Sequence, residues 1–235
     1  MIKIYLLDFS GAEAAQNHLS ALPDFVEKTK NKDLKRERAF SYMLLFYAYK
    51  MWKNSSDNPK NDNNCFQNSQ YNMPNIERDE NGRPYFLNEN IDFNLSHDGN
   101  MAAVAISDEG AIGIDIQLCR DVVSPRLCEK VNGYYESKWL SALMAGADQL
   151  EDAVMTVYSS DQEISEVGCV STLKTDGQDL FCRWASLEAI VKADGRGISG
   201  FRSIEAEKGL FTLRKAKVTD RAGKEYALSV ALHFR

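Results

Sequence analysis

The residues most able to do chemistry lie in two short segments that are far apart in the chain. Residues 112–117 carry Asp115, and residues 184–192 carry Glu188. Two carboxylates that come together repel each other unless a cation lies between them. Magnesium suits such a pair because it prefers oxygen ligands and usually takes one or two carboxylates, with waters and substrate phosphates completing its shell. The two segments therefore predict a magnesium–phosphate site, provided that the fold brings them together.

The neighbours of the two carboxylates fit the same chemistry. Gln117 follows Asp115 by two positions, so both side chains share one face of a strand, and the amide oxygen of Gln117 is a further candidate metal ligand. Lys192 follows Glu188 by four positions, which puts both on one helix face. Glu188 is a candidate general base, and Lys192 is a candidate for neutralising a departing phosphate. Considered alone, Glu188 and Lys192 more often form a solvated ion pair.

A strand and a helix are predicted to position these two segments. In residues 111–116, isoleucines alternate with a glycine and an aspartate, which indicates a strand with one apolar face and one polar face. This strand is predicted to form a β-hairpin with residues 101–106. A helix is predicted over residues 181–193, where it ends before a glycine. We therefore expect Asp115 on the polar face of a strand and Glu188 on a helix.

The remaining patterns predict an α+β fold of two lobes, each an antiparallel sheet packed with helices. The two halves meet near residues 108–111 without a linker, so lobes of residues 1–108 and 109–235 are expected. Residues 54–75 are rich in Asn, Ser, Asp and Pro and predict a loop. The other predicted elements are a first strand within residues 1–9, helices at 12–22, 39–52 and 125–144, a strand at 91–96, a short strand within 159–178, and strands after residue 211.

The composition is that of an ordinary globular chain and argues against some classes of function. The 235 residues carry a net charge of −6 and a pI of about 5.2, which disfavours binding to duplex DNA or to an anionic membrane. The five cysteines lack CxxC spacing and favour reduced thiols over disulfides or a zinc ribbon. The first residues are too polar for a signal peptide, and no apolar run has membrane-spanning length, so we expect a soluble cytoplasmic protein.

Five short motifs occur in an order that resembles one known family. They are Gly82-Arg83-Pro84-Tyr85, Asn94-Leu95-Ser96-His97, Ile112-Gly113-Ile114-Asp115-Ile116, Trp184 through Glu188 to Lys192, and Asp194-Gly195-Arg196-Gly197-Ile198. Together they resemble the 4'-phosphopantetheinyl transferases of the surfactin-synthetase-activating type, within the holo-carrier-protein synthase superfamily. A weaker match covers residues 38–45, and Glu136 resembles a glutamate that the family has between its main motifs. Each motif alone is weak, but all five in order are specific.

The resemblance implies a pseudo-twofold fold whose two similar lobes enclose the active site in the cleft between them. It implies magnesium-dependent transfer of the phosphopantetheine arm of coenzyme A, a co-substrate, to a serine of an apo acyl or peptidyl carrier protein, with release of 3',5'-ADP. Such carriers work in fatty acid biosynthesis and in secondary metabolism. No nucleic acid or membrane partner is expected. A monomer is expected because both lobes belong to one chain.

The resemblance also implies a role for each matching side chain. Asp115 and Glu188 would hold magnesium, with Gln117 at a position where the family often has an acid. Lys192 would lie near the pyrophosphate. The implied contacts to coenzyme A are Ser96 and His97 to the nucleotide phosphates, Arg83 to a phosphate or the adenine, and Arg38 and Lys28 to the 3'-phosphate.

Two departures from the family pattern leave other functions open. Gln117 removes one negative charge beside the metal, and Leu187 stands where the family favours a lysine, whose phosphate contacts Arg183 could replace in part. These changes motivate a degenerate member that binds coenzyme A or a carrier protein without catalysis. A magnesium-dependent phosphohydrolase is a second alternative, although the chain lacks a clustered aspartate motif and a glycine-rich phosphate loop. A purely structural interaction module is the third, and it predicts that Asp115→Ala leaves the biological activity intact.

Overall fold

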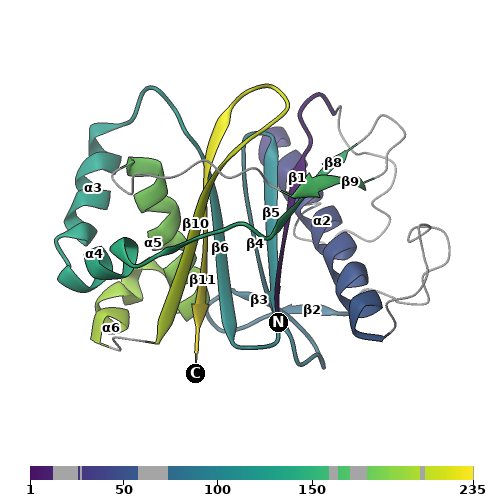
Figure 1. Cartoon of the computed structure of the whole chain (residues 1–235), viewed down its shortest axis with the longest axis horizontal. Coiled ribbons are helices and arrows are strands. Elements are labelled where there is room, and N and C mark those ends of the chain that lie inside the picture. Colours follow the sequence, from purple (N-terminus) through teal and green to yellow (C-terminus); the bar gives the residue numbers. More distant parts are fainter. Residues whose placement is uncertain are drawn as a thin grey trace.

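The fold consists of helices and sheets stacked in four layers (Figure 1). The structure is a computed structural model that describes residues 1–12, 26, 28–57, 74–158, 164–169, 179–206 and 210–234. One long helix, a five-stranded sheet, a four-stranded sheet and a group of helices follow one another across the molecule. The predicted α+β class is confirmed. Within these residues, no helix has the length and apolar character that crossing a membrane requires.

The five-stranded sheet is covered on one face by the long helix α2. Its strand order is β4-β5-β1-β8-β9, in which β1 runs parallel to β8 and every other neighbouring pair is antiparallel. Buried aromatic side chains of α2, such as Phe40 and Tyr47, pack against the sheet. The elements are β1 (Ile2–Asp8), α2 (Lys32–Asp57), β4 (Asp92–Asp98), β5 (Met101–Ser107), β8 (Ala153–Tyr158) and β9 (Ile164–Cys169).

The four-stranded sheet is covered on its outer face by α5, around which shorter helices pack. Its strand order is β6-β11-β10-β7. A small separate hairpin, β2 (Ile76–Arg78) with β3 (Pro84–Phe86), precedes β4. The elements are β6 (Ala111–Leu118), α3 (Pro125–Tyr135), α4 (Lys138–Ala145), β7 (Asp148–Gln149), α5 (Leu180–Asp194), the short 3-10 turn η1 (Ile198–Gly200), α6 (Phe201–Ala206), β10 (Phe211–Thr219) and β11 (Glu225–His233).

The two sheets pack face to face through aliphatic side chains. The three isoleucines of β6 are fully buried and share one cluster with Ile4 and Leu6 of β1. Burial of each such side chain contributes about 1.5–3 kcal/mol. The predicted apolar face of β6 is therefore confirmed. The opposite face of the strand, which carries Asp115, is directed toward α5.

The predicted hairpin between β5 and β6 is wrong. The two strands follow one another through a short turn, but β5 pairs with β1 and β4, whereas β6 pairs with β11. The chain therefore steps from one sheet to the other at residues 108–110. Local alternation indicates that two strands are present but cannot show which distant strand each one pairs with, because β5 and β6 are both buried on both faces.

Side chains of β4 hydrogen-bond to the backbone of β6 and join the two sheets at their edges. Both strands are edge strands, so the backbone N–H groups of β6 that point away from β11 need other acceptors. Every second side chain of β4 supplies one. We call these four bonds the β4–β6 junction. They run from Ile112 N to Asp92 Oδ2 (2.7 Å), Ile114 N to Asn94 Oδ1 (3.2 Å), Ile116 N to Ser96 Oγ (3.3 Å) and Leu118 N to Asp98 Oδ2 (2.8 Å).

Several predicted boundaries differ from the structure. Helix α2 begins at Lys32, so the charged residues from 32 to 38 belong to it. The helix predicted over 125–144 is two helices, because Ser137 caps a new N-terminus. Most of the helix predicted at 12–22 and most of the predicted loop at 54–75 lie outside the described residues. The two-lobe division at residue 108 stays a prediction, and β8 and β9 extend the first sheet with later residues.

Candidate active site

Asp115 lies at the middle of β6 and binds three side-chain donors. Its side chain is 2% exposed. Lys192 Nζ lies 2.6 Å from Oδ1, and Ser96 Oγ donates to the same oxygen at 2.8 Å. Gln117 Nε2 donates to Oδ2 at 2.7 Å. The structure therefore brings together four of the predicted site residues, from β4, β6 and α5.

A close approach of α5 to β6 makes this cluster possible, and Gly113 permits the approach. A Cβ atom at residue 113 would lie 2.0 Å from the carbonyl oxygen of Ala189 and 2.5 Å from the nitrogen of Ala193. No side chain fits in that space. One strand further, the buried hydroxyl groups of Ser186 and Ser229 are 2.9 Å apart and pair α5 with β11. The glycine of the predicted motif thus sets the distance between the helix and Asp115.

Lys192 links the site to the β4–β6 junction. Besides Asp115, its ammonium group donates to Ser96 Oγ at 3.2 Å and to the carbonyl oxygen of Ile114 at 3.1 Å. Ser96 in turn accepts from Ile116 N, so one hydroxyl group contacts the backbone of β6, the carboxylate and the lysine. Lys192 lies in the last turn of α5, where a cation is favoured by the helix dipole.

Glu188 lies one turn before Lys192 and is half-buried. Within the described part of the chain, no donor is within hydrogen-bonding distance of its carboxylate. Burial raises the pKa of Glu188 above its ordinary value, and the nearby Asp115 carboxylate raises it further. Lys192 and Lys130 oppose this rise in pKa only in part. A second positive charge beside Glu188 and Asp115 would stabilise the ionised pair.

The two carboxylates fit a magnesium ion whose coordination is completed by a substrate. Among the described residues, no cluster of three or more His, Cys, Asp or Glu side chains could hold a metal unaided. Magnesium commonly takes only one or two carboxylates with substrate phosphates, and the open carboxylate of Glu188 next to Asp115 matches that pattern. Gln117 turns its amide nitrogen toward Asp115, so direct ligation through its oxygen requires a different contact with Asp115.

Arg83 lies at the other end of the junction. Its guanidinium group pairs with Asp92 at 2.5 Å and donates to the carbonyl oxygen of Ile112 at 2.7 Å. The side chain is only 12% exposed. Asp92 also accepts from Ile112 N, so Arg83 and Asp92 together satisfy both backbone groups of that residue. These contacts make Arg83 a tie between the sheets, separate from the donors that surround Asp115.

The other residues predicted to bind coenzyme A line up along α2. The ring of His97 lies 3.1 Å from the Glu37 carboxylate, measured from Nδ1 to Oε2. Arg38 donates to the hydroxyl group of Thr29 at 2.9 Å, and Lys28 is exposed just before the helix. His97 follows Ser96 on β4, so this group begins next to the Asp115 cluster.

Leu187, which departs from the family pattern, and Arg183, its suggested substitute, do not contact Asp115. Leu187 is fully buried among the residues that pack α4 and α6 against α5. The guanidinium group of Arg183 lies 4.1 Å from the ring centroid of Tyr135 and donates to the side chain of Asn132 on α3. Leu187 is therefore a core residue, and Arg183 anchors α3. Glu136 is exposed at the end of α3.

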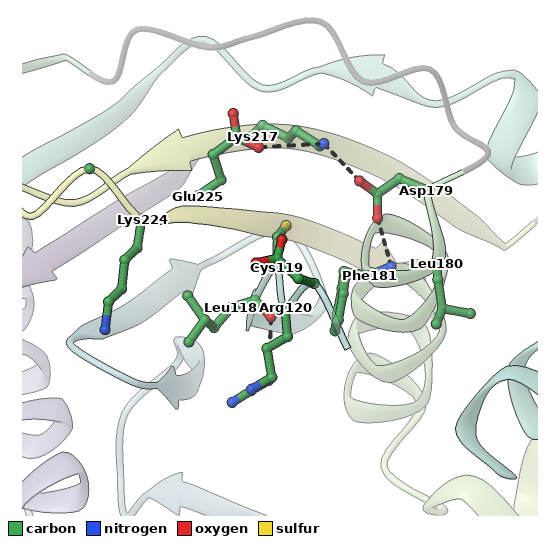
Figure 2. A pocket seen from close by; sticks show the side chains of 11 residues that line it. Leu118, Cys119, Arg120, Asp179, Leu180, Phe181, Lys217, Lys224 and Glu225 are labelled. Atoms are coloured by element: carbon green, nitrogen blue, oxygen red, sulfur yellow. Dashed lines mark hydrogen bonds and ion pairs between the residues drawn. The ribbon is translucent and has the colours of Figure 1, made fainter. Parts of the chain in front are cut away.

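A cavity of about 640 Å³ lies beyond the end of β6, at the first turn of α5 (Figure 2). Lys217 and Asp179 form an ion pair at 2.7 Å, and Asp179 caps α5 by accepting from Phe181 N at 2.8 Å. Burial raises the pKa of the Cys119 thiol, which lines the cavity, to about 11. Burial raises the pKa of the adjacent Cys182 to about 12. Neither thiol is ionised at neutral pH, which argues against either of these two cysteines as a nucleophile.

Sequence reasoning missed the supporting residues of the site. Asp92 and Asp98 are absent from the predicted site, and Asn94 appears there only as part of a motif without a role, although the alternation of these residues along β4 indicates a polar face. Lys130 gave no signal, because its approach to Trp184 depends on how α3 packs against α5. Glu37 was likewise hidden in a charged stretch that resembles an ordinary solvated helix face.

Comparisons with known proteins lead to one group of enzymes. A putative 4'-phosphopantetheinyl transferase from Haemophilus influenzae is 41% identical over 68 residues, which cover 27% of this chain and 29% of the relative. The 4'-phosphopantetheinyl transferases AcpT of two Escherichia coli strains are 32% identical over 125 residues, covering 52% of this chain and 50% of each relative. No protein-family model matches the chain.

The matches cover only part of each relative. The chain spans half or less of the length of these curated relatives. The similarity supports the 4'-phosphopantetheinyl transferase family in general and does not distinguish the surfactin-synthetase-activating type.

Proposed function

We propose that this protein transfers the 4'-phosphopantetheine arm of coenzyme A to a serine of an apo carrier protein. One observation carries the proposal: no hydrogen-bond donor among the described residues reaches the half-buried carboxylate of Glu188, which lies beside the Asp115–Lys192 pair. A purely structural carboxylate in this position would have a donor, because burying an unpaired charge is costly. The similarity to 4'-phosphopantetheinyl transferases supports the same reaction.

The residues of this chain fit the steps of that reaction. The carrier serine oxygen forms a bond to the phosphorus that bears the pantetheine arm, and the bond from that phosphorus to the leaving 3',5'-ADP breaks. Glu188 accepts the serine proton. Lys192 neutralises charge on the departing phosphate. Magnesium, held by Asp115 and Glu188, would supply charge that offsets the negative pyrophosphate.

The contacts of coenzyme A are proposed to extend along the junction and α2. Ser96 and His97 would bind the nucleotide phosphates, and Arg38 and Lys28 the 3'-phosphate. Arg83 would contact a phosphate or the adenine from its place beside Asp92. The two arginines suit phosphate because a guanidinium group offers paired, charge-assisted hydrogen bonds. The carboxylates and Lys192 come from one chain, so a monomer is proposed as the active form.

The direct test is the intact mass of an apo carrier protein after incubation with this protein, coenzyme A and magnesium. Acyl and peptidyl carriers are tried in parallel, each with a chelator control. We expect a magnesium-dependent gain of one phosphopantetheine arm, and no gain with Asp115→Ala. A gain that persists unchanged with Asp115→Ala would overturn the site.

A second candidate is a protein that binds coenzyme A or a carrier without transfer. It is favoured by the three donors that already occupy both oxygens of Asp115. Binding of coenzyme A in calorimetry, together with no mass gain on any carrier, would support it over the transferase. Release of 3',5'-ADP without a carrier would instead indicate a phosphohydrolase.

A further inference from the structure

A single carboxylate lies among the cations near the start of α2. Glu37 stands between Arg36 and Arg38, and Lys35 lies just before them. Within the described residues, its carboxylate forms an ion pair with none of these cations and has one hydrogen-bond partner, the imidazole ring of His97. A negative charge beside a proposed phosphate site repels the ligand. Charge complementarity to a phosphate therefore does not explain this glutamate.

Arg36 fixes the helical turn that carries Glu37. Its guanidinium group donates to the carbonyl oxygens of Phe9 and Ala12, at 3.0 and 3.1 Å, and lies 4.8 Å from the ring centroid of Phe9. These contacts tie the first turns of α2 to the end of β1. Glu37 consequently projects from an anchored turn, so its carboxylate can hold a neighbouring side chain in one direction.

Strand β4 places His97 between the Asp115 cluster and α2. Ser96 projects from one face of the strand and donates to Asp115 at 2.8 Å, whereas His97 projects from the other face toward Glu37. His97 Nδ1 lies 3.1 Å from Glu37 Oε2, and the side chains are 18% and 21% exposed. An ionised carboxylate only accepts, so Nδ1 carries a proton. In the described part of the chain no group hydrogen-bonds to Nε2, which leaves that nitrogen to a ligand.

We propose that Glu37 is a positioning residue that holds the ring of His97 so that Nε2 faces the 3'-phosphate of coenzyme A. This inference rests on the proposed function. The 3'-phosphate is assigned to Arg38, which follows Glu37 on α2, so it lies on the side of β4 that His97 faces. The doubly protonated ring then donates from Nδ1 to Glu37 and from Nε2 to the phosphate. Glu37 acts on the ligand through His97 and does not touch it.

The test compares the binding of coenzyme A and 3'-dephospho-coenzyme A in calorimetry, because the two ligands differ by one phosphate group. We expect Glu37→Ala to raise the dissociation constant of coenzyme A about fivefold, since the ring can turn and its charge-assisted hydrogen bond to the phosphate weakens. The dissociation constant of the dephospho ligand should stay within about twofold of wild type. Glu37→Gln should keep both constants within about twofold, because its amide oxygen still accepts from Nδ1.

Two further variants isolate the contact between Glu37 and His97. Asp33→Ala is the matched control, because Asp33 is an exposed acid one helical turn before Glu37 and carries the same charge. It should raise neither dissociation constant. His97→Ala should weaken coenzyme A selectively, and adding Glu37→Ala to it should cost less than about twofold more, because both substitutions act through one ring.

The outcomes keep this inference distinguishable from the transfer reaction. Unchanged binding by Glu37→Ala, equal weakening of both ligands, or equal losses in the alanine and glutamine variants would each overturn the positioning role. Selective weakening by Glu37→Ala in a protein that modifies no carrier would contradict the proposed function and leave the role of Glu37 supported. Failure of the wild-type protein to bind coenzyme A would contradict both.

Discussion

Two carboxylates near β6, Asp92 and Glu188, differ in the hydrogen-bond partners that the fold gives them. Burial raises the pKa of both above the ordinary value. Asp92 holds Arg83 at 2.5 Å and accepts from Ile112 N at 2.7 Å, whereas no donor in the described part of the chain reaches Glu188. The first carboxylate has the partners that structural stability requires, and the second lacks them. The contrast separates a tie between two sheets from a group that awaits a cation or a proton.

The largest expected effect is on transfer when the open carboxylate is removed. Glu188→Gln should lower the rate of carrier modification about 10²–10⁴-fold, the usual contribution of a general base. Its unfolding free energy should not fall, because the variant removes a buried charge without breaking a hydrogen bond. The mass assay and urea unfolding measure the two quantities. Glu151→Gln, at an exposed glutamate, is the control, and near-wild-type transfer by Glu188→Gln would remove Glu188 from the mechanism.

The next largest effect should follow from separating α5 from β6. Gly113→Ala places a Cβ atom 2.0 Å from the carbonyl oxygen of Ala189, so the helix must move. We expect a loss of about 3 kcal/mol or more in unfolding free energy, from overpacking against backbone. Both the Asp115–Lys192 pair and transfer should be lost with it.

A second glycine provides the matched control for this substitution. Gly133 lies in α3, where an added Cβ meets nothing within 4 Å. Gly133→Ala should stabilise the protein by about 0.5–1 kcal/mol through the higher helix propensity of alanine. If Gly113→Ala behaves like Gly133→Ala in chemical denaturation, the close approach of α5 to β6 does not exist in solution.

A smaller loss of stability should follow from removing the carboxylate of Asp92, whose hydrogen bonds are satisfied. Asp92→Ala removes the carboxylate to which both Arg83 and Ile112 N donate, and we expect unfolding free energy to fall by about 2–3 kcal/mol. Transfer at saturating substrates should change less than in Glu188→Gln, because Asp92 does not contact the Asp115 cluster. A stability loss equal to that of Glu188→Gln would erase the distinction between the two carboxylates.

The sequence predicts the surroundings of Glu188 but not those of Asp92. Isoleucine alternation in β6 and the spacing of Glu188 and Lys192 are local patterns, so the strand, the helix and the meeting of Asp115 with Lys192 could be predicted. Asp92 and the rest of the junction could not, because their partners are backbone groups of a strand in another sheet. The same long-range pairing produced the wrong hairpin.

The roles of Leu187 and Arg83 also depend on contacts between distant elements. Leu187 occupies a position that the family pattern marks as a lysine, but its direction into the core depends on α4 and α6. Arg83 was expected beside a phosphate, yet its ion pair with Asp92 depends on how the β2–β3 hairpin precedes the junction. Spacing along one helix or strand could be predicted from the sequence, whereas contacts between elements could not.

The smallest expected effect is a pH dependence of stability, which distinguishes the two carboxylates when it is measured with and without magnesium. A carboxyl group whose pKa is raised by folding favours the folded state below the pKa of the unfolded chain, and that contribution is lost as the pH rises through the folded value. Wild-type protein should therefore lose stability relative to Glu188→Gln as the pH rises above the ordinary range of glutamate. Asp92 should contribute a loss of the same sign, because its pKa is also raised.

Magnesium should cancel the loss at Glu188 and leave the loss at Asp92. A cation bound between Asp115 and Glu188 stabilises the ionised pair, and at about ten times its dissociation constant it adds about 1.4 kcal/mol to the folded state. Asp92 already has Arg83 as its cation, so magnesium has no reason to act there. Urea unfolding of wild type, Glu188→Gln and Asp92→Asn across this pH range, with and without magnesium, measures both effects. A pH slope that magnesium leaves unchanged in wild type would mean that Glu188 does not share a metal with Asp115, and the open carboxylate would then serve as a base alone.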